Sequence, residues 1–570
     1  MTETKKDFGV LYGQKTTEDA LLIYSSYEDS KASPKMGDFI VLAPRTEDGQ
    51  KFLARVEAEI YDEDPIFRNQ DKTLIAVHYA RISQRELSDR DKQKMFSYTY
   101  KVKILGSYTI SDGKDFTTAV RKLPTVSYHA RHLTHGEITN ILNRTNEHGE
   151  VIGFLCIGED FEAREEIKFD ISKLKEKRTL VLAQSGFGKT NLMKVLIYST
   201  LNDESCGRLI FDLNGEYFAR GEKTYGLGDV NETKVRDRLV VYTDRKEIAG
   251  KYENRFIHGG DVKVNFSRDF TINDIFQASV GLTNAAKTFL NYLDSLPTGN
   301  EQDVQEFISK ILTPTDSKAA RAFAYRKFSS FFEAKVEKAG DDDDALEATV
   351  KQETKSMLGG VIRQIRSFSS IHDPRSDLVE KVLEHLSAKK TVVIDLSLKD
   401  NQDASLIATA LVRRLFSDNK QNFTSGEKGK VRNAVIFVEE AQNVLSEEFV
   451  RTNANPFVRV AKEGRKFGLG LVAVTQRPSA ISEEIRSQAE NFFAFYMGNT
   501  KDIRALVESN LNFDGVISRF LQSETISGNL YMVSSGQSFA LPLRVRHFEQ
   551  MVHQYVYPDM QLDEFKKKAE

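Results

Sequence analysis

The chain has 570 residues, which is long for one hydrophobic core, so we expect two or more domains. Its formal net charge of −3 excludes a globally basic protein that coats nucleic acid, so any contact with DNA has to be focal. The two cysteines stand in no paired motif, and no apolar run approaches the roughly 20 residues of a membrane span, so we expect a reduced, soluble, cytoplasmic protein with no membrane partner.

Residues 1–165 have a pattern typical of β-structure and form the first predicted domain. Runs of apolar and β-branched residues, separated by glycine and charged turns, predict short strands. Several short strands at this spacing are typical of a small barrel. The predicted strands cover residues 38–42, 52–56, 73–77 and 98–105.

A glycine-rich loop joins a predicted strand to an amphipathic helix in the next part of the chain. The usual phosphate-binding pattern is Gly-x-x-x-x-Gly-Lys-Ser/Thr, and here Ala183 stands at the first glycine. Gly186 and Gly188 allow backbone N–H groups and the helix N-terminus to face an anion. Lys189 can reach the β- and γ-phosphates, and the hydroxyl of Thr190 can ligate Mg²⁺.

A chance Gly-Lys-Thr at the start of a helix is the alternative interpretation of this loop. The strand before it and the helix after it supply the context that a P-loop needs, so we predict that the chain binds a nucleoside triphosphate. The candidate nucleotide-binding residues in this loop are Ser185, Gly186, Phe187, Gly188, Lys189, Thr190 and Asn191.

Residues 166–547 follow an α/β pattern and form the second predicted domain. Alternating apolar strands and helices predict a mostly parallel sheet that is covered on both faces. Between about 272 and 388, apolar residues recur at helical spacing instead, which predicts a helical insertion. Residues 548–570 leave the sheet as a C-terminal tail. The predicted strands of the sheet after the P-loop cover residues 208–212, 239–242, 391–395, 434–438, 470–475 and 492–496.

Two adjacent acids follow the predicted strand at 434–438, which is the Walker B arrangement of P-loop enzymes. Glu439 can support Mg²⁺ through its water shell, and Glu440 can deprotonate the attacking water as a general base. Gln476 ends the next strand, where a polar side chain can sense the γ-phosphate or the water. Solvated acids and polar strand ends without a catalytic role are the alternatives. For Asp212, which ends another strand, proximity to the nucleotide and a buried capping role are both open.

Taken together, these motifs resemble those of the HerA family of hexameric, DNA-translocating ATPases, in the FtsK–HerA branch of the RecA-like P-loop proteins. The departures are Ala183 for glycine, Glu439 for aspartate, and Asn214 where the family often has histidine. The resemblance implies ATP and Mg²⁺ as cofactors, a RecA-like core, a homo-hexameric ring, and an N-terminal HAS barrel that helps subunits assemble. The motifs lie at 183–190, 211–217, 393–397, 438–442, 464–468 and 474–479, and the most diagnostic are Asn-Gly-Glu-Tyr at 214–217 and Thr-Gln-Arg-Pro-Ser at 475–479.

The resemblance also implies an arginine finger. Arg465 matches the family arginine that reaches the γ-phosphate of a neighbouring subunit, where a delocalised cation stabilises the transferring phosphoryl group. Without the family match, Arg465 is most simply a surface arginine in a salt bridge. A second family arginine precedes the P-loop; Lys177 stands at its register and Arg178 is adjacent, so Arg178 is a further candidate for nucleotide binding.

Two interpretations of function remain open from the sequence. The first is a ring motor that hydrolyses ATP while it moves duplex DNA through its centre, with basic residues such as Arg451, Arg459 and Lys462 on the phosphate backbone. No nuclease constellation is visible, so DNA end processing or phage defence needs a partner, which by resemblance is a NurA-type nuclease or a sirtuin-like NAD hydrolase. The second is an oligomeric scaffold that organises such an effector and uses ATP as a structural ligand.

Overall fold

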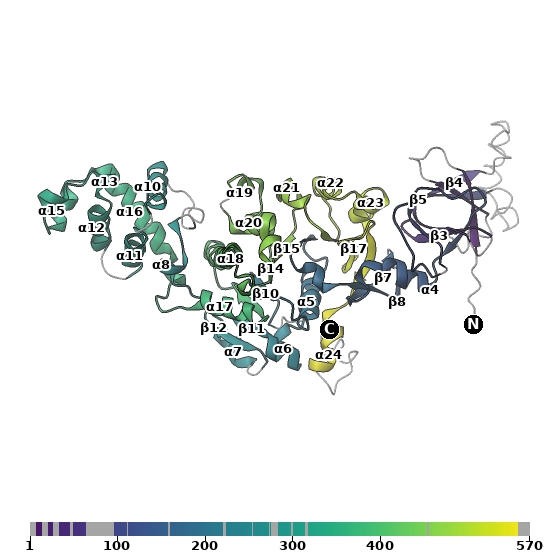
Figure 1. Ribbon diagram of the computed structural model, residues 1–570, viewed down its shortest axis with the longest axis horizontal. Helices are drawn as coiled ribbons and strands as arrows, with labels where there is room; N and C mark the ends of the chain where they lie inside the picture. The colour runs from purple at the N-terminus through teal and green to yellow at the C-terminus, as the bar shows by residue number, and fades with distance from the viewer. Residues whose placement is uncertain are drawn as a thin grey trace, which may run out of the picture.

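The protein is elongated, with a sheet-based core between a small barrel at one end and a group of helices at the other (Figure 1). The predicted strand at 73–77 lies outside the described residues. The computed structural model describes residues 7–13, 21–26, 34–45, 49–63, 96–110, 112–157, 160–219, 224–252, 255–272, 274, 283–297, 300–313, 317–452 and 455–556.

Six strands near the N-terminus close into a barrel, as predicted. Successive residues of a strand point to opposite sides, and β3 (Phe39–Ala43) uses both. Ile40 and Leu42 belong to the barrel core, whereas Phe39 and Val41 pack with the core beside the large sheet. The barrel is therefore joined to the rest of the protein by apolar packing. Its other strands, in order around the barrel after β3, are β6 (His129–His132), β1 (Asp7–Gly13), β2 (Leu21–Ser26), β5 (Phe96–Tyr108) and β4 (Lys51–Glu63).

One large sheet organises the remainder, and its described strands number twelve. From β12 to β16 each neighbouring pair is parallel, and from β16 to β8 each pair is antiparallel. The order is β12 (Ile257–Gly260), β11 (Leu239–Tyr242), β13 (Thr391–Asp395), β10 (Gly207–Asp212), β14 (Ala434–Val438), β15 (Leu469–Thr475), β9 (Arg178–Leu182), β16 (Asn491–Ala494), β17 (Asn529–Val533), β18 (Leu541–Val545), β7 (Glu150–Ile157) and β8 (Asp160–Phe169).

The central parallel strands β10, β13, β14 and β15 are buried on both faces, which explains why they appear in the sequence as continuous apolar runs. Alternate residues of β9 enter different cores: Leu180 and Leu182 pack on one face of the sheet and Val181 on the other. The first face is covered by α17 (Leu378–Ser387), α18 (Asn401–Thr424) and α20 (Pro456–Glu463), and the second by α5 (Lys189–Thr200), α6 (Thr233–Arg238) and α24 (Phe548–Val556).

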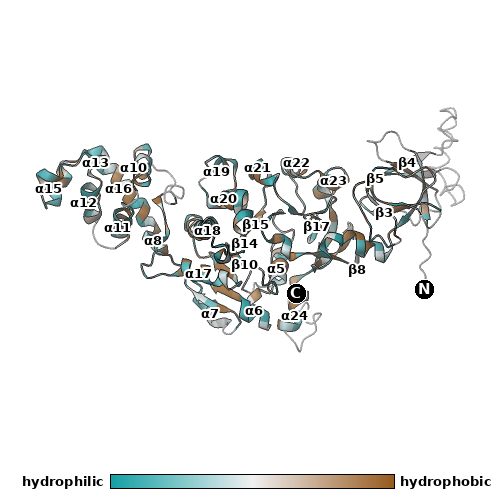
Figure 2. Cartoon of the chain, in the orientation of Figure 1, coloured by the Kyte–Doolittle hydropathy of each residue, from teal (hydrophilic) through white to brown (hydrophobic). Residues whose placement is uncertain are grey.

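The predicted insertion between β12 and β13 is helical. Phe289 lies at its centre, with ring centroids 5.0 Å from both Phe331 and Phe332. In Figure 2, hydrophobic residues gather on α16 in the middle of the group, whereas α12 is largely hydrophilic. Its main described helices are α10 (Asn284–Asp294), α11 (Glu301–Leu312), α12 (Ser317–Lys327), α15 (Asp343–Ala348) and α16 (Gln352–Ser367). No helix in the described parts of the chain is both long and apolar enough to cross a membrane.

The domain boundary that we predict at residue 165 falls inside β8. β7 and the first part of β8 lie before residue 166, yet β7 pairs with β18 at the end of the large sheet and β8 pairs with β7. These two strands therefore carry the hydrogen-bonded sheet toward the barrel.

Candidate nucleotide-binding site

The P-loop is a tight turn between β9 and α5, as the sequence predicts. Gly186 and Gly188 have φ angles of +86° and +100°, in the region that favours glycine. A Cβ on Gly188 would lie 3.3 Å from the backbone of Gly528, so this glycine also permits a close approach of two chain segments. Gly188 is the N-cap of α5, and Lys189 begins the helix. The free N–H groups of the first turn therefore face the loop, where an anion binds favourably.

Lys189 lies close to both predicted Walker B acids, which directly follow β14. Its Nζ is 3.9 Å from an oxygen of Glu439 and 3.9 Å from an oxygen of Glu440. The β14 and β9 strands are parallel with β15 between them, so their carboxyl ends meet at one edge of the sheet. The structure thus brings together the P-loop lysine and both acids, which are about 250 residues apart in sequence by their numbers.

Glu440 is held by two amide side chains. Gln476 Nε2 donates to one carboxylate oxygen at 2.9 Å, and Gln442 Nε2 donates to the other at 2.6 Å. The orientation of Gln442 is fixed in turn, because its Oε1 accepts a hydrogen bond of 2.6 Å from the hydroxyl of Thr475. Glu440 is 30% exposed and has a φ of +46°, so a partly open carboxylate is turned toward Lys189 by an unusual backbone conformation.

Glu439 is the more buried acid, with 6% of its side chain exposed. The hydroxyl of Tyr217 donates a hydrogen bond to it. Burial raises the pKa of Glu439 above its ordinary value, and the Tyr217 hydroxyl and the Lys189 cation oppose this shift. Burial also raises the pKa of Tyr217, which therefore stays a hydrogen-bond donor.

Thr190 lies beside a third carboxylate, because its hydroxyl donates to Glu216 at 2.9 Å. Hydroxyl and carboxylate oxygens are the ligands that Mg²⁺ prefers, and Mg²⁺ is usually held by few protein groups together with phosphate oxygens. Within the described residues, no group of three or more histidine, cysteine, aspartate or glutamate side chains is spaced to hold a metal ion alone. Thr190 and Glu439 therefore fit an ion that arrives with a nucleotide.

Asp212 supports the site through the backbone. Its carboxylate accepts hydrogen bonds from the N–H groups of Gly215, Glu216 and Tyr217, at 2.7 to 3.1 Å. Burial raises the pKa of Asp212 to about 7, and the nearby acids Glu439 and Asp395 add to this shift. Of the two roles left open by the sequence, the structure shows the buried cap. The capped turn supplies the Glu216 and Tyr217 side chains described above.

The other predicted P-loop residues have structural contacts of their own. The ring of Phe187 packs against Tyr496, with centroids 4.6 Å apart. Asn191 is tied to the C-terminal segment, since its side chain donates to the carbonyl of Arg546 and accepts from the N–H of Phe548, both at 2.8 Å. Ser185 is exposed in the loop.

Arg465 and Arg178 lie at the opposite edge of the sheet from the P-loop. Arg465 is in the short turn Gly464–Phe467 that precedes β15, and Arg178 is the first residue of β9. Arg465 is exposed, and its side chain is in no ion pair with the residues that the structure describes. Neither arginine meets the nucleotide site of its own chain. Of the basic residues proposed for DNA, Arg451 pairs with Glu447 and Lys462 with Glu484.

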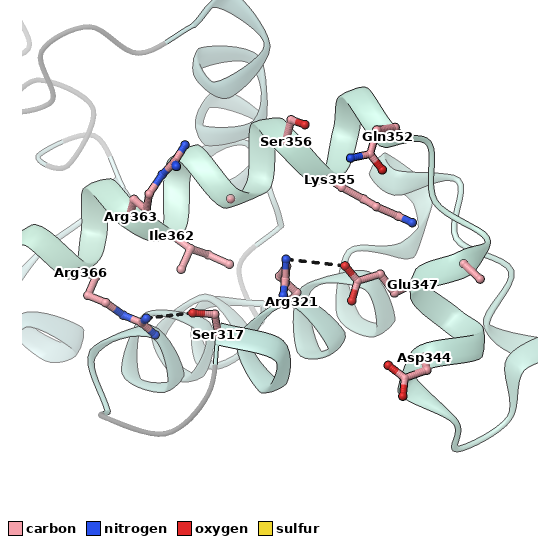
Figure 3. A pocket seen from close by; sticks show the side chains of 12 residues that line it. Ser317, Arg321, Asp344, Glu347, Gln352, Lys355, Ser356, Ile362, Arg363 and Arg366 are labelled. Atoms are coloured by element: carbon pink, nitrogen blue, oxygen red, sulfur yellow. Dashed lines mark hydrogen bonds and ion pairs between the residues drawn. The ribbon is translucent and has the colours of Figure 1, made fainter.

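A cavity of about 770 Å³ lies elsewhere, in the helical insertion between α12, α15 and α16. Figure 3 shows its mixed charge: Arg366 donates to Ser317 at 2.9 Å, and Arg321 lies 3.6 Å from Glu347. No predicted nucleotide-binding residue lines this cavity. The candidate phosphate site therefore consists of the P-loop and the two acids after β14 and is separate from this cavity.

Sequence reasoning gave no role to Glu216, Tyr217 or Gln442. All three stand inside the motifs at 211–217 and 438–442, so the sequence pattern marked their positions but not their partners. Their functions depend on partners that only the folded sheet brings close, such as the pair Tyr217 and Glu439.

Comparisons with known proteins find similar families and similar chains. The family described as "Helicase HerA, central domain" matches residues 152–415, and the family "Zonular occludens toxin (Zot)" matches residues 383–499. A solved structure, VirB4 of Thermoanaerobacter pseudethanolicus, is 14% identical with a TM-score of 0.39, covering 70% of this chain and 96% of that one.

Two curated relatives are similar over much of the chain. The "DNA double-strand break repair helicase HerA" of Sulfurisphaera tokodaii is 25% identical over 373 residues, which are 65% of each chain. The "Probable helicase MJ1565" of Methanocaldococcus jannaschii is 24% identical over 81% of this chain and 77% of its own. The chain thus spans just under two thirds of the length of the first relative. Together with the P-loop and Walker B geometry, these matches show that the chain is similar to HerA helicases, above all over residues 152–415, and support an ATP-hydrolysing enzyme.

Proposed function

We propose that the protein is an ATP-hydrolysing ring motor that translocates duplex DNA. The observation that carries this proposal is the geometry of Glu440, whose carboxylate is held by Gln442 and Gln476 and lies 3.9 Å from the Nζ of Lys189. A base beside the cation that binds the γ-phosphate is the arrangement needed to activate water for in-line attack.

In the proposed mechanism, the N-terminus of α5 and Lys189 bind the β- and γ-phosphates and neutralise their charge. Glu440 accepts a proton from the attacking water, while the amide of Gln476 orients the carboxylate. Thr190 and Glu439 would hold Mg²⁺, which would supply further neutralisation of the phosphate oxygens. Tyr217 keeps the carboxylate of Glu439 in place through its hydrogen bond.

The active unit in this proposal is a homo-hexameric ring in which Arg465 completes the site of a neighbouring subunit. Support comes from its position before β15, whereas the P-loop follows the other end of the adjacent strand β9. The strand β9 has five residues at about 3.3 Å each, so roughly 16 Å of strand separate the two edges. Arg465 therefore cannot serve the site of its own chain.

In this proposal a partner enzyme supplies the effector activity, which is either DNA cleavage or NAD hydrolysis. Curated relatives carry the name "DNA double-strand break repair helicase", which favours a role in processing DNA ends with a NurA-type nuclease. Phage defence with a sirtuin-like NAD hydrolase is the other role consistent with the family resemblance. Purifying the protein from its host and identifying the enzyme that co-elutes with the ring distinguishes these two partners.

The test of the proposed function is steady-state ATP hydrolysis with and without linear duplex DNA. We expect DNA to stimulate hydrolysis by the wild-type ring and Lys189→Ala to abolish it in both conditions, because the γ-phosphate loses its cation. The matched control is Lys430→Ala, which removes an exposed lysine paired with Glu427. Assembled rings that hydrolyse ATP at one rate regardless of DNA would contradict the motor and favour the scaffold.

A further inference from the structure

Arg178 makes hydrogen bonds to two different segments at the amino edge of the sheet, residues 488–490 and the end of α20. Its backbone N–H donates to Glu490 at 2.9 Å, and its Nε donates to the same carboxylate oxygen at 3.4 Å. Its Nη1 donates to Gln488 at 2.5 Å and to the backbone carbonyl of Ala461 at 3.0 Å. Only 19% of the side chain is exposed. The guanidinium is therefore committed to protein contacts rather than free to meet a ligand.

The contact with Ala461 reaches the segment that presents Arg465. Ala461 lies in the last turn of α20, where backbone carbonyls lack helical partners and a cation binds favourably. Arg465 follows four residues later, in the turn that links α20 to β15. A second contact, an ion pair, holds the same turn: the Nζ of Lys462 lies 2.9 Å from a carboxylate oxygen of Glu484. The direction in which Arg465 leaves the subunit thus depends on how the end of α20 is held.

Arg178 is also linked, through the strand that it begins, to the P-loop of its own chain. Arg178 begins β9, and β9 leads directly into residues 183–188. All five residues of this strand pair with β15, and residues 179–182 also pair with β16, so the strand is held on both sides. The chain therefore contains one continuous physical connection from its own phosphate-binding loop, through Arg178, to the arginine that it offers to a neighbour.

We propose that Arg178 is a positioning residue that fixes the end of α20 and thereby aims Arg465 at the neighbouring nucleotide site. This inference rests on the proposed trans role of Arg465. It replaces direct nucleotide binding by Arg178, since the guanidinium points to Ala461 and Gln488 and a strand length separates it from the P-loop of its own chain.

The first test compares Arg178→Ala with Arg465→Ala and their double variant in assembled rings. We expect Arg178→Ala to lower kcat about 10- to 100-fold, because misplacing a catalytic group by an ångström has effects of this size. Affinity for a fluorescent ATP analogue should stay within about twofold of wild type. The double variant should be no slower than Arg465→Ala alone, because both changes remove the same interaction. The matched control is Arg414→Ala, an arginine paired with Asp418 on α18.

Conservative replacement and hydrogen exchange complete the design. Arg178→Lys keeps a cation that can donate to Ala461 and should recover part of the lost rate. Amide hydrogen exchange of residues 461–467 should speed up in Arg178→Ala and not in Arg414→Ala, whatever the activity of the ring. This readout separates the inference from the proposed function: wild-type hydrolysis by Arg465→Ala rings would contradict the trans finger, whereas unchanged exchange at 461–467 would contradict the role of Arg178. Loss of nucleotide affinity in Arg178→Ala, or a multiplicative loss in the double variant, would overturn it in favour of direct contact.

Discussion

Glu440 combines a strained backbone with a fixed side chain. A non-glycine residue in the left-handed region costs on the order of 1 kcal/mol or more, and such strain persists where the surrounding structure imposes it. Here the strain turns the carboxylate back toward Lys189, and two amides hold it there. The conformation is thus explained by the chemistry that the side chain performs in the proposed mechanism.

Replacing Glu440 by glutamine tests that chemistry. Glu440→Gln keeps the shape of the side chain but removes the base, so we expect nucleotide binding to be retained and hydrolysis to fall by about 10²- to 10⁴-fold. Equilibrium binding of a fluorescent ATP analogue and phosphate release measure the two effects separately. Glu427→Gln, on an exposed loop, is the control. Normal hydrolysis by Glu440→Gln would assign the base to another residue.

The raised pKa of Asp212 makes stability depend on pH in a defined direction. Its pKa is about 7 in the folded protein and 3.8 in a model peptide, so the folded state holds a proton that the unfolded state releases between these values. Stability contributed by this group therefore falls as the pH rises from about 4 to 7. Between pH 5 and 7 the loss is on the order of 2 kcal/mol.

The variant Asp212→Asn removes this titration. We expect its melting temperature to change less between pH 5 and 7 than that of the wild type, measured by thermal unfolding in matched buffers of equal ionic strength. Asp237→Asn, on the surface of α6, should keep the wild-type pH dependence. An identical pH profile in Asp212→Asn and wild type would show that the buried carboxyl does not titrate in this range.

The P-loop turn depends on two glycines for different reasons. Both have positive φ angles, so an alanine at either costs roughly 1–2 kcal/mol of backbone strain. A Cβ at Gly188 also meets the backbone of Gly528 at 3.3 Å, whereas a Cβ at Gly186 has no atom within 4 Å. We expect Gly188→Ala to weaken ATP binding more than Gly186→Ala, as measured by titration calorimetry. Equal losses would show that strain alone decides.

The local elements were predictable from the sequence, because each depends on neighbouring residues. The strands at 208–212, 391–395 and 434–438 are continuous apolar runs, and the structure has them at the same positions. The P-loop likewise needs only a strand, two glycines and a helix start. What the sequence could not supply was the pairing between distant elements.

Two parts of the site show this limit. Tyr217 donates to Glu439 across 222 positions of sequence, and the contact arises because β10 and β14 are neighbours in the sheet. The family resemblance made Arg178 a candidate for nucleotide binding, but β9 is extended and places Arg178 at the opposite edge from the P-loop of its own chain. Distance along a strand is distance in space, and the motif alone does not show it.

At the scale of the whole molecule, the two edges of the sheet carry complementary parts of the proposed catalytic site. One carries the P-loop and the acids without a finger, and the other carries Arg465 without a nucleotide site. In the proposed ring, head-to-tail contact between copies would unite the two sets, because head-to-tail contacts generate a ring when the rotation between copies closes.

Mixed rings test this complementarity. Arg465→Ala and Lys189→Ala protomers are each expected to be inactive alone. The first lacks the arginine finger, and the second lacks the cation that binds the γ-phosphate. In a one-to-one mixture, about a quarter of the head-to-tail contacts pair an intact P-loop with an intact Arg465. We expect phosphate release to rise above both single variants after co-assembly. Arg465→Ala rings that assemble, bind ATP and hydrolyse it at the wild-type rate would refute the finger.

The continuation of the large sheet into β7 and β8 has a practical consequence for anyone who shortens the protein. A truncated version that begins at residue 166 would delete β7 and most of β8 and leave the hydrogen-bonding edge of β18 uncovered. An open edge of this kind recruits other chains, so such a fragment should precipitate on expression. A version that begins at residue 134 keeps both strands and the hydrogen bond between Asn146 and Ser534, and is the better starting point for separating motor from barrel.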